Sequence, residues 1–442
     1  MTYSIAKTRQ LCWHLSWPAM LSGVMIPLMG MVDMAVVGRL PNSKAMGAVA
    51  LGAWLFDLFY WSFGFLRMGT TGLSAQAYGR NDRSELILQW IRPVFLALVL
   101  GGILFISAPL YLYIMMPWLR GNDQALKQLC QDYFMARVWG GPAVLVNYVC
   151  VGWLLGVQKS KWVLLIQSTL AFCNIALSLI LGDMIGLIGV AYASAIAQVI
   201  VAIIASYICY RTFAMSIWTV VRDYTFKDKH AWYQLWNVNR NLMLRSILLL
   251  LAFGAFHSVS VRQNSDLLAA NALLLHLQTL QAFILDGFAH AMVAMVGQAL
   301  GAKDKLQLQI TLKVGWQYST CASVIIAILY LLFFTPLISC FTTHMNIIAT
   351  AQSYWMWAVI SPICSAPCFL LDGVMIGATL SRTMFIAMGI SVICYLICLF
   401  ILPIMLGNHG IFLSLMIFML LRALTLYPSS QSLLSHFKYT IK

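Results

Sequence analysis

Long apolar runs dominate the chain, and short polar segments separate them. Twelve runs are long enough to cross a bilayer, because about 20 apolar residues span its hydrocarbon core. They lie at about 14–38, 46–70, 88–115, 134–157, 162–181, 186–209, 243–261, 268–293, 314–338, 351–377, 384–405 and 410–430. Strands of a membrane barrel would be about ten residues long with alternating polarity. The pattern therefore predicts an all-α polytopic membrane protein with twelve transmembrane helices.

The composition supports a membrane protein, since 62% of the residues are hydrophobic and only 9% are charged. A soluble domain has about 25% charged residues. The first apolar stretch follows Lys7 and Arg9 and is longer than the roughly 7–15 apolar residues of a signal peptide, so it predicts a span. The eleven cysteines fall mostly inside apolar runs, without His or carboxylates at ligand spacing. We expect no metal site.

The positive residues predict the orientation of the chain. The net charge of +14 comes from short loops, which favours cytoplasmic loop charge over nucleic-acid binding. With a cytoplasmic N-terminus, twenty lysines and arginines fall on the cytoplasmic side and six on the other. This assignment puts Arg92, Arg245 and Arg422 on the cytoplasmic side and Arg137 on the opposite side, with Arg67 inside a span. We expect an inner-membrane protein with both termini in the cytoplasm.

The two halves of the chain resemble each other. The matched positions are Ala75–Asp82 with Gly297–Asp304, and Gly152 and Gly156 with Gly373 and Gly377. We expect an N-terminal lobe at 1–222, a C-terminal lobe at 223–442, and a cytoplasmic linker at 211–240. Each lobe has six predicted helices, so the lobes form a parallel repeat about an axis along the membrane normal. Such repeats are typical of transporters whose site lies between the halves.

Ionisable side chains inside a span cost about 2.5–3.5 kcal/mol at the helix centre and usually face a cavity. Asp33, near the outer end of the first span, either bonds to a neighbouring helix or is a desolvated carboxylate that exchanges a proton. Asp286 and His290 lie four residues apart and either share a proton or satisfy each other. For the other polar candidates, cavity lining and helix packing both stay open: Asn147, Asn174, Asn271 and Asp372. Asp57 and Arg67 are also intramembrane, and the sequence assigns them no role.

Glycine and proline inside spans indicate points where helices bend. The candidate hinges are Pro27, Gly141 with Pro142, and Pro362. The repeat sets Gly141-Pro142 opposite Ser361-Pro362, so we expect a break in both halves. No P-loop, HExxH, GxSxG or Cys/His metal spacing occurs, which argues against an enzyme or an ATP-driven pump. Of the function classes considered, a passive or ion-driven carrier is left.

Several segments resemble the multidrug and toxic-compound extrusion (MATE) family, in its DNA-damage-inducible F branch. They are Val32–Gly38, Gly64–Leu73, Leu268–Ala272, Asp286–Ala289, Gly297–Gly301, Leu371–Gly373 and Ile376–Thr379. The resemblance covers essentially the whole chain. It implies cation-coupled export of bulky, often cationic amphiphiles by alternating access between two six-helix lobes.

The resemblance also implies roles for single residues. Asp33 lies where the family carries its N-lobe coupling aspartate, and Asn174 where a partner amide is found. Val293 stands where many relatives carry an acidic residue, and Ser178 where some carry Asp. Fewer carboxylates favour a proton on Asp33 over sodium, and Ser178 joins the candidates for a cavity or second coupling site.

The sequence thus predicts a monomeric, proton-coupled multidrug antiporter without a cofactor. Its expected partners are small amphiphilic molecules and the bilayer. The first alternative is a flippase for a lipid-linked precursor, whose cavity would hold several Arg or Lys, whereas only Arg67 is assigned to a span. The second is a membrane protein without transport activity, which the absence of a reactive cluster or soluble domain argues against.

Overall fold

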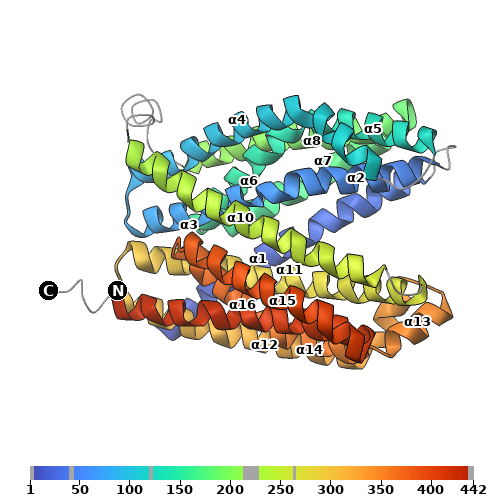
Figure 1. Cartoon of the computed structure of the whole chain (residues 1–442). Coiled ribbons are helices and arrows are strands. Elements are labelled where there is room, and N and C mark those ends of the chain that lie inside the picture. The colour runs from blue at the N-terminus through green and yellow to red at the C-terminus, as the bar shows by residue number, and fades with distance from the viewer. Residues whose placement is uncertain (1–3, 39–43, 119–122, 213–227, 262–264, 437–442) are drawn as a thin grey trace. The chain divides into compact units, whose positions relative to one another are not determined.

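The chain folds into long helices joined by short turns. The computed structural model describes residues 4–38, 44–118, 123–212, 228–261 and 265–436, and all regular structure in these ranges is helical. The N-terminal half contains α1 (Ile5–Val37), α2 (Lys44–Trp61), η1 (Ser62–Gly64), α3 (Phe65–Gly79), α4 (Arg83–Met115), η2 (Met116–Trp118), α5 (Gln124–Val138), α6 (Gly141–Gly156), α7 (Ser160–Ile185) and α8 (Leu187–Thr212) (Figure 1). The C-terminal half contains α10 (Lys229–Ser260), α11 (Ser265–Gly301), α12 (Lys305–Ser339), α13 (Met345–Gln352), α14 (Trp355–Gly377), α15 (Ser381–Leu406) and α16 (Asn408–His436).

The helices match the predicted number of membrane spans. Within the described ranges, eleven helical stretches are each long and apolar enough to cross a membrane. Two further helices, α5 and α6, pass the same test together and meet at an angle of 52°. The prediction of an all-helical, polytopic membrane protein with about twelve spans is confirmed.

The predicted repeat recurs in the turns between helices. The residues described with a positive φ angle form three pairs: Asn81 (56°) with Lys303 (55°), Gln158 (62°) with Thr379 (56°), and Gly186 (70°) with Gly407 (57°). After the first pair, Asp82 caps α4 by accepting from the Glu85 amide at 3.0 Å, and Asp304 caps α12 by accepting from the Gln307 amide at 2.8 Å. Side-chain oxygens at such N-caps satisfy free amides of the first turn. The halves therefore share turn geometry as well as helix order.

Each half also contains one close helix crossing that requires glycine. A methyl group at Gly156 of α6 would lie 2.7 Å from the carbonyl oxygen of Thr71 in α3. The corresponding group at Gly377 of α14 would lie 2.7 Å from the carbonyl oxygen of Val293 in α11. Small residues let helix backbones approach closely in membranes. The match between Gly156 and Gly377 in the sequence therefore corresponds to the same kind of close helix contact in both halves.

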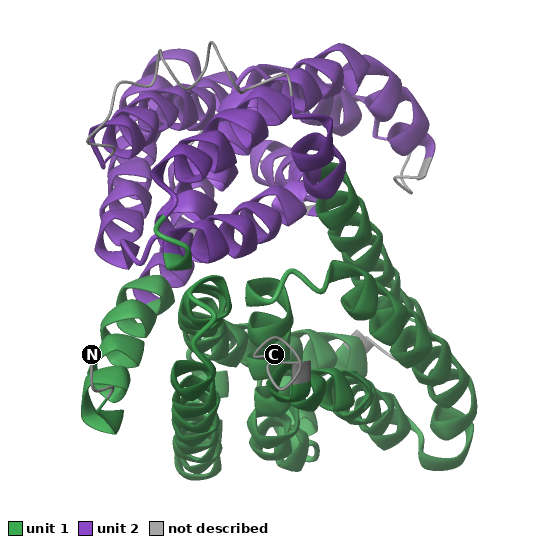
Figure 2. Ribbon diagram, turned by 90° about the vertical axis from the view of Figure 1, so that its left-hand side faces the viewer, with its two compact units in different colours: residues 1–20, 79–81, 236–442 green, residues 21–78, 82–235 purple. Residues whose placement is uncertain are grey.

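The contacts divide the chain into two compact units that exchange helix ends (Figure 2). Unit 2 holds residues 21–78 and 82–235, and unit 1 holds residues 1–20, 79–81 and 236–442. Two helices, α1 and α10, therefore each contribute to both units. The proposed lobe boundary between 222 and 223 lies outside the described residues, as do 213–227 of the proposed linker. The boundary stays a prediction.

The start of α1 packs within unit 1 against helices of the C-terminal half. Cys12 and Leu15 join a buried apolar cluster with Phe288 of α11 and Val314 of α12. Burial of such side chains contributes roughly 1.5–3 kcal/mol each in water, although packing dominates between membrane helices. The first five turns of α1 are thereby tied to α11 and α12.

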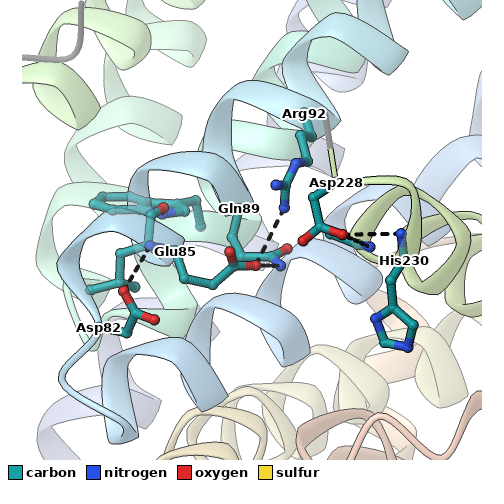
Figure 3. A network of polar contacts seen from close by, with 9 residues as sticks. Asp82, Glu85, Gln89, Arg92, Asp228 and His230 are labelled. Atoms are coloured by element: carbon teal, nitrogen blue, oxygen red, sulfur yellow. Dashed lines mark hydrogen bonds and ion pairs between the residues drawn. The ribbon is translucent and has the colours of Figure 1, made fainter. Parts of the chain in front are cut away.

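The start of α10 packs within unit 2 against α4. Trp232 meets Phe95 edge to face, with ring centroids 6.1 Å apart. Nearby, Gln89 and Arg92 of α4 both point toward Glu85, with the Arg92 Nη1 3.4 Å from the carboxylate (Figure 3). Arg92 is only 2% exposed, whereas the sequence placed only Arg67 inside a span; the cytoplasmic side of Arg92 stays a prediction. A long side chain paired within its own helix satisfies its charge without leaving the bundle.

Candidate functional site

Asp33 lies near the end of α1 with its side chain buried, only 5% exposed. Ser178 of α7 donates a hydrogen bond to its Oδ1 at 2.8 Å, and Ser194 of α8 donates to its Oδ2 at 3.3 Å. Both donors are neutral hydroxyl groups. The structure therefore brings Asp33 together with the predicted candidate Ser178 and adds Ser194.

The hairpin between α7 and α8 positions the two serines. Gly186 ends α7 with φ +70°, a conformation that residues with a side chain rarely adopt, and α8 begins at the next residue. Close to this turn, a methyl group at Gly182 would lie 2.9 Å from Val36 of α1. Tight packing at the turn holds α1, α7 and α8 together beside Asp33.

Asn174 reaches Asp33 through Ser194. Its Nδ2 donates to the Ser194 Oγ at 2.9 Å, while its own Oδ1 is buried with no partner in the described part of the chain. Ser194 accepts from the amide and donates to the carboxylate, which forms a short relay. Sequence reasoning missed Ser194 because serine in an apolar helix usually bonds to its own backbone and leaves no distinguishing pattern.

A half-buried arginine interacts with this group. Arg137 stands in the last turn of α5, with its guanidinium carbon 4.2 Å from the centre of the Phe56 ring and Nη1 3.4 Å from the Tyr133 hydroxyl. It interacts electrostatically with both Asp33 and Asp57. The helix that carries it belongs to a bent span, and the position of Arg137 on the outer side stays a prediction. The signal in the sequence was its position inside the apolar run 134–157.

A small cavity separates Arg137 from the Asp33 relay. Its volume is about 20 Å³, and its walls are formed by Phe56, Arg137, Gly140, Val144, Ser194, Ala195 and Gln198. A cavity of at least roughly 10–15 Å³ with polar partners can hold one water molecule. Arg137, Ser194 and Gln198 supply such partners here.

Asn147 lies behind the same cavity. Its Nδ2 donates to the side-chain oxygen of Gln198 at 2.7 Å and to the Gln198 carbonyl at 3.1 Å. Asn147 thereby joins α6 to α8 and orients a side chain that lines the cavity. It does not contact Asp33 directly.

A different polar cluster occupies the C-terminal half. Asp372 of α14 accepts hydrogen bonds on Oδ2 from Arg245 of α10 and, at 2.6 Å, from Arg422 of α16. Both arginines are 4% exposed. Each lies inside a long helix and is paired there, whereas the sequence placed only Arg67 inside a span; their cytoplasmic side stays a prediction. If Arg92, Arg245 and Arg422 are left out of the count, more lysines and arginines still fall on the predicted cytoplasmic side than on the other side.

Asp286 and His290 lie one turn apart on α11, and both are half-buried. Asp286 interacts electrostatically with Arg422 and Cys368, so it belongs to the arginine cluster. The structure therefore links Asp286 to Arg422 and Asp372. A shared proton between Asp286 and His290 stays a prediction.

Asn271 is held in a reciprocal amide pair. Its Nδ2 donates to the Asn408 Oδ1 at 2.8 Å and to the Ser260 Oγ at 3.3 Å, while Asn408 donates back to its Oδ1 at 2.8 Å. All hydrogen-bonding atoms of the Asn271 side chain are thereby used. This arrangement ties α10, α11 and α16 together and favours the packing interpretation.

The hinge candidates fall in three different settings. The chain bends by 52° between α5 and α6, directly before Gly141 and Pro142. The counterpart Pro362 is buried inside a continuous α14, and the chain breaks earlier, between α13 and α14. Two glycines precede Pro142, whereas an isoleucine and a serine, which cost a helix less than glycine does, precede Pro362; this agrees with the difference between the halves. Pro27 is exposed inside a continuous α1, and its hinge role stays a prediction.

The two remaining intramembrane candidates also differ. Asp57 of α2 is exposed and interacts with Arg137, whereas Arg67 of α3 is half-buried. A methyl group at Gly152 of α6 would clash with the Arg67 backbone. Arg67 thus lies on a crossing where the backbones of α3 and α6 nearly touch.

About twelve apolar spans in the described ranges, turn geometry repeated between the halves and a buried carboxylate in each half are features of a multi-pass membrane transporter. The MatE family model matches residues 18–180 and 242–401 of the chain. The chain belongs to this family, as its motifs indicated. It is a membrane transporter and not an enzyme.

Individual relatives show how far the similarity extends. The chain is 34% identical over 426 residues to DNA damage-inducible protein F of Escherichia coli (strain K12), covering 94% of this chain and 90% of that protein. It is 23% identical over 348 residues to a probable multidrug resistance protein NorM of Photorhabdus laumondii, covering 76% of this chain and 74% of that protein.

A solved structure of a MOP superfamily transporter from Pyrococcus furiosus shares the fold, with a TM-score of 0.84 and 18% identity. The match covers 98% of this chain and 97% of that chain, and that protein is described as having a binding pocket of reverse polarity that suggests a different function. MATE transporters bind small-molecule substrates, which agrees with the expected class of partner.

Proposed function

We propose that this transporter is a proton-coupled antiporter that exports bulky amphiphilic or cationic compounds, and that Asp33 carries the coupling proton. The observation that carries the proposal is the contrast between Asp33 and Asp372. Asp33 accepts hydrogen bonds from two neutral hydroxyls, whereas Asp372 accepts from two arginines on one oxygen.

A coupling carboxylate must be stable in both its ionised and its protonated form. A serine hydroxyl can donate to a carboxylate and can equally accept from a carboxylic acid. Ser178 and Ser194 therefore support either state of Asp33 after a simple rotation of the hydroxyl hydrogen. An arginine only donates, so protonating Asp372 would leave a buried guanidinium with a weakened partner.

The ligand set favours a proton over a metal ion. Hard cations such as Ca²⁺ and Mg²⁺ usually take about six or more oxygen ligands. In the described group around Asp33, one carboxylate is joined by Ser178, Ser194 and Asn174. This supply of oxygens supports protonation of Asp33 as the coupling event.

The buried arginines bear on the flippase alternative, because a flippase cavity would need free positive charges for a pyrophosphate. Several arginines do lie within spans, contrary to the expectation from the sequence. However, Arg245 and Arg422 are engaged by Asp372, and Arg92 by Glu85. Because these guanidinium groups are already paired with carboxylates, they do not form a pyrophosphate site. Export of amphiphiles therefore remains the favoured function.

The proposal includes an inner-membrane location, cytoplasmic termini and a monomer. Transport is tested with purified protein in proteoliposomes containing a fluorescent lipophilic cation such as ethidium. We expect a pH gradient to drive ethidium against its concentration gradient and a sodium gradient of equal size to have no effect. Transport driven by sodium alone would contradict proton coupling, and movement of a labelled lipid-linked precursor without ethidium transport would favour the flippase.

A further inference from the structure

Arg137 is a half-buried cation that interacts electrostatically with two carboxylates, and in the described part of the chain it forms an ion pair with neither. Its described contacts are the Phe56 ring at 4.2 Å and the Tyr133 hydroxyl at 3.4 Å. Among the described residues, no carboxylate forms an ion pair with it. A guanidinium over an aromatic face is stabilised by about 0.5–2 kcal/mol, much less than a buried charge requires.

The groups around Arg137 come from its own helix and from four others. Asp33 of α1 and Asp57 of α2 interact with it electrostatically, as do Tyr133 of its own helix and Tyr148 of α6. The facing part of α8 supplies the neutral side chains of Ser194 and Gln198. One cation therefore stands among two carboxylates and two phenols.

The cavity provides room for the side chain to move. It measures about 20 Å³ and has Arg137 on one wall and Ser194 on another. Ser194 is hydrogen-bonded to Asp33. The volume is that of about one water molecule, so a small rotation about the arginine side-chain bonds is enough to bring the guanidinium closer to the Ser194 wall and the Asp33 relay.

We propose that Arg137 is a positioning residue for Asp33, a tethered cation that pairs with Asp33 when its carboxylate is ionised and turns to Asp57 when Asp33 holds a proton. This inference rests on the proposed function of Asp33. The tethered charge neutralises the empty site after the proton leaves. A separate metal ion is then unnecessary, which gives a physical reason for proton coupling.

The test is the pH profile of ethidium binding to the purified full-length chain in lipid nanodiscs. Arg137→Gln removes the cation, so the ionised form of Asp33 loses its partner and the midpoint moves to higher pH by about one unit or more. Arg137→Lys retains a charge and should restore most of the wild-type midpoint. Lys127→Gln removes a positive charge from the same helix far along it, and should leave the midpoint unchanged.

In a second variant, Asp57→Asn, we expect the pH midpoint of ethidium binding to move in the opposite direction. Without Asp57, Arg137 is more available to Asp33, so the midpoint moves to lower pH. Asp57 is exposed, so this variant keeps the packing of the bundle. If Arg137→Gln does not fold, an unmoved midpoint in Asp57→Asn overturns the role of Arg137.

Asp33→Asn separates this inference from the proposed function. A wild-type pH profile in Asp33→Asn would overturn the proposed function itself. A profile flattened by Asp33→Asn but unmoved by both Arg137→Gln and Asp57→Asn would overturn only the role of Arg137. Opposite shifts in these two variants would support it.

Discussion

Ser178 lies 2.8 Å from Asp33, between Oγ and Oδ1, and joins α7 to α1 across 145 positions of the sequence. The sequence suggested Ser178 only as a replacement for an acidic residue found in some relatives. A carboxylate at this position would place two negative charges in contact and favour a shared proton or a bound cation. A hydroxyl leaves Asp33 as the one carboxylate of the described hydrogen-bonded group.

Replacing Ser178 should change proton coupling without unfolding the protein. Ser178→Ala removes a donor to the ionised form of Asp33, which is worth about 0.5–1.5 kcal/mol. The pH midpoint of gradient-driven ethidium transport should therefore move to higher pH by roughly half to one unit. Transport measured across a series of external pH values checks this shift.

Ser391 offers a matched control for Ser178. It is equally buried but donates to its own helix, to the Ala387 carbonyl at 2.8 Å. Ser391→Ala should leave the midpoint unchanged. Equal shifts in both variants would mean that the effect comes from lost packing.

Asp372 should behave as a structural residue. Asp372→Asn leaves Arg245 and Arg422 buried with one negative charge fewer, and breaking such a pair costs about 3–5 kcal/mol. We expect a marked fall in the melting temperature in detergent, larger than the fall in Asp33→Asn. An Asp372→Asn protein with wild-type stability and no proton coupling would instead assign the coupling role to the C-terminal half.

Much of the fold could be predicted because a bilayer imposes length and hydrophobicity on each span. The repeat could be recognised from the segments around turn residues such as Asn81 and Lys303. The two turns have the same backbone geometry, which restricts the residue types at both places. The bend before Gly141 was also visible as a Gly-Pro signal. Its expected twin at Pro362 was not found, because helix packing maintained α14 through the proline.

The site could be predicted only in part. Asp33, Asn174 and Ser178 were marked by their polarity inside apolar runs. The buried ion pairs of Arg245 and Arg422 were not predicted, because hydropathy cannot distinguish an arginine in a loop from one that is paired inside a bundle. Such pairing depends on helices far apart in the sequence, which a single sequence does not align in space.

The orientation of the chain predicts which side of the membrane each thiol meets. Cys340 is exposed just beyond the end of α12 and should face the outside. A cysteine introduced by Lys229→Cys, at the start of α10, should face the cytoplasm. In intact cells, an impermeant thiol reagent should label Cys340 and spare position 229, as peptide mass spectrometry would show. The reverse pattern would contradict cytoplasmic termini.

Pro27 should matter for motion more than for folding. A proline inside a helix removes one backbone hydrogen bond and lowers the cost of bending. Pro27→Ala should reduce ethidium transport several-fold while leaving folded yield near wild type. Pro109→Ala, at an exposed proline inside α4, serves as control and should retain transport. If Pro27→Ala transports ethidium at the wild-type rate, this proline contributes only to packing.

The central claim is that the proton that drives transport resides on Asp33. Asp33→Asn retains the shape and hydrogen-bonding capacity of the side chain but fixes it in a neutral form. In proteoliposomes with an imposed pH gradient, this variant should lose ethidium transport against a concentration gradient, while ethidium affinity stays within a few-fold because apolar surface holds most of the substrate. Gradient-driven transport by Asp33→Asn at the wild-type rate would contradict the account and direct attention to Asp286 and His290.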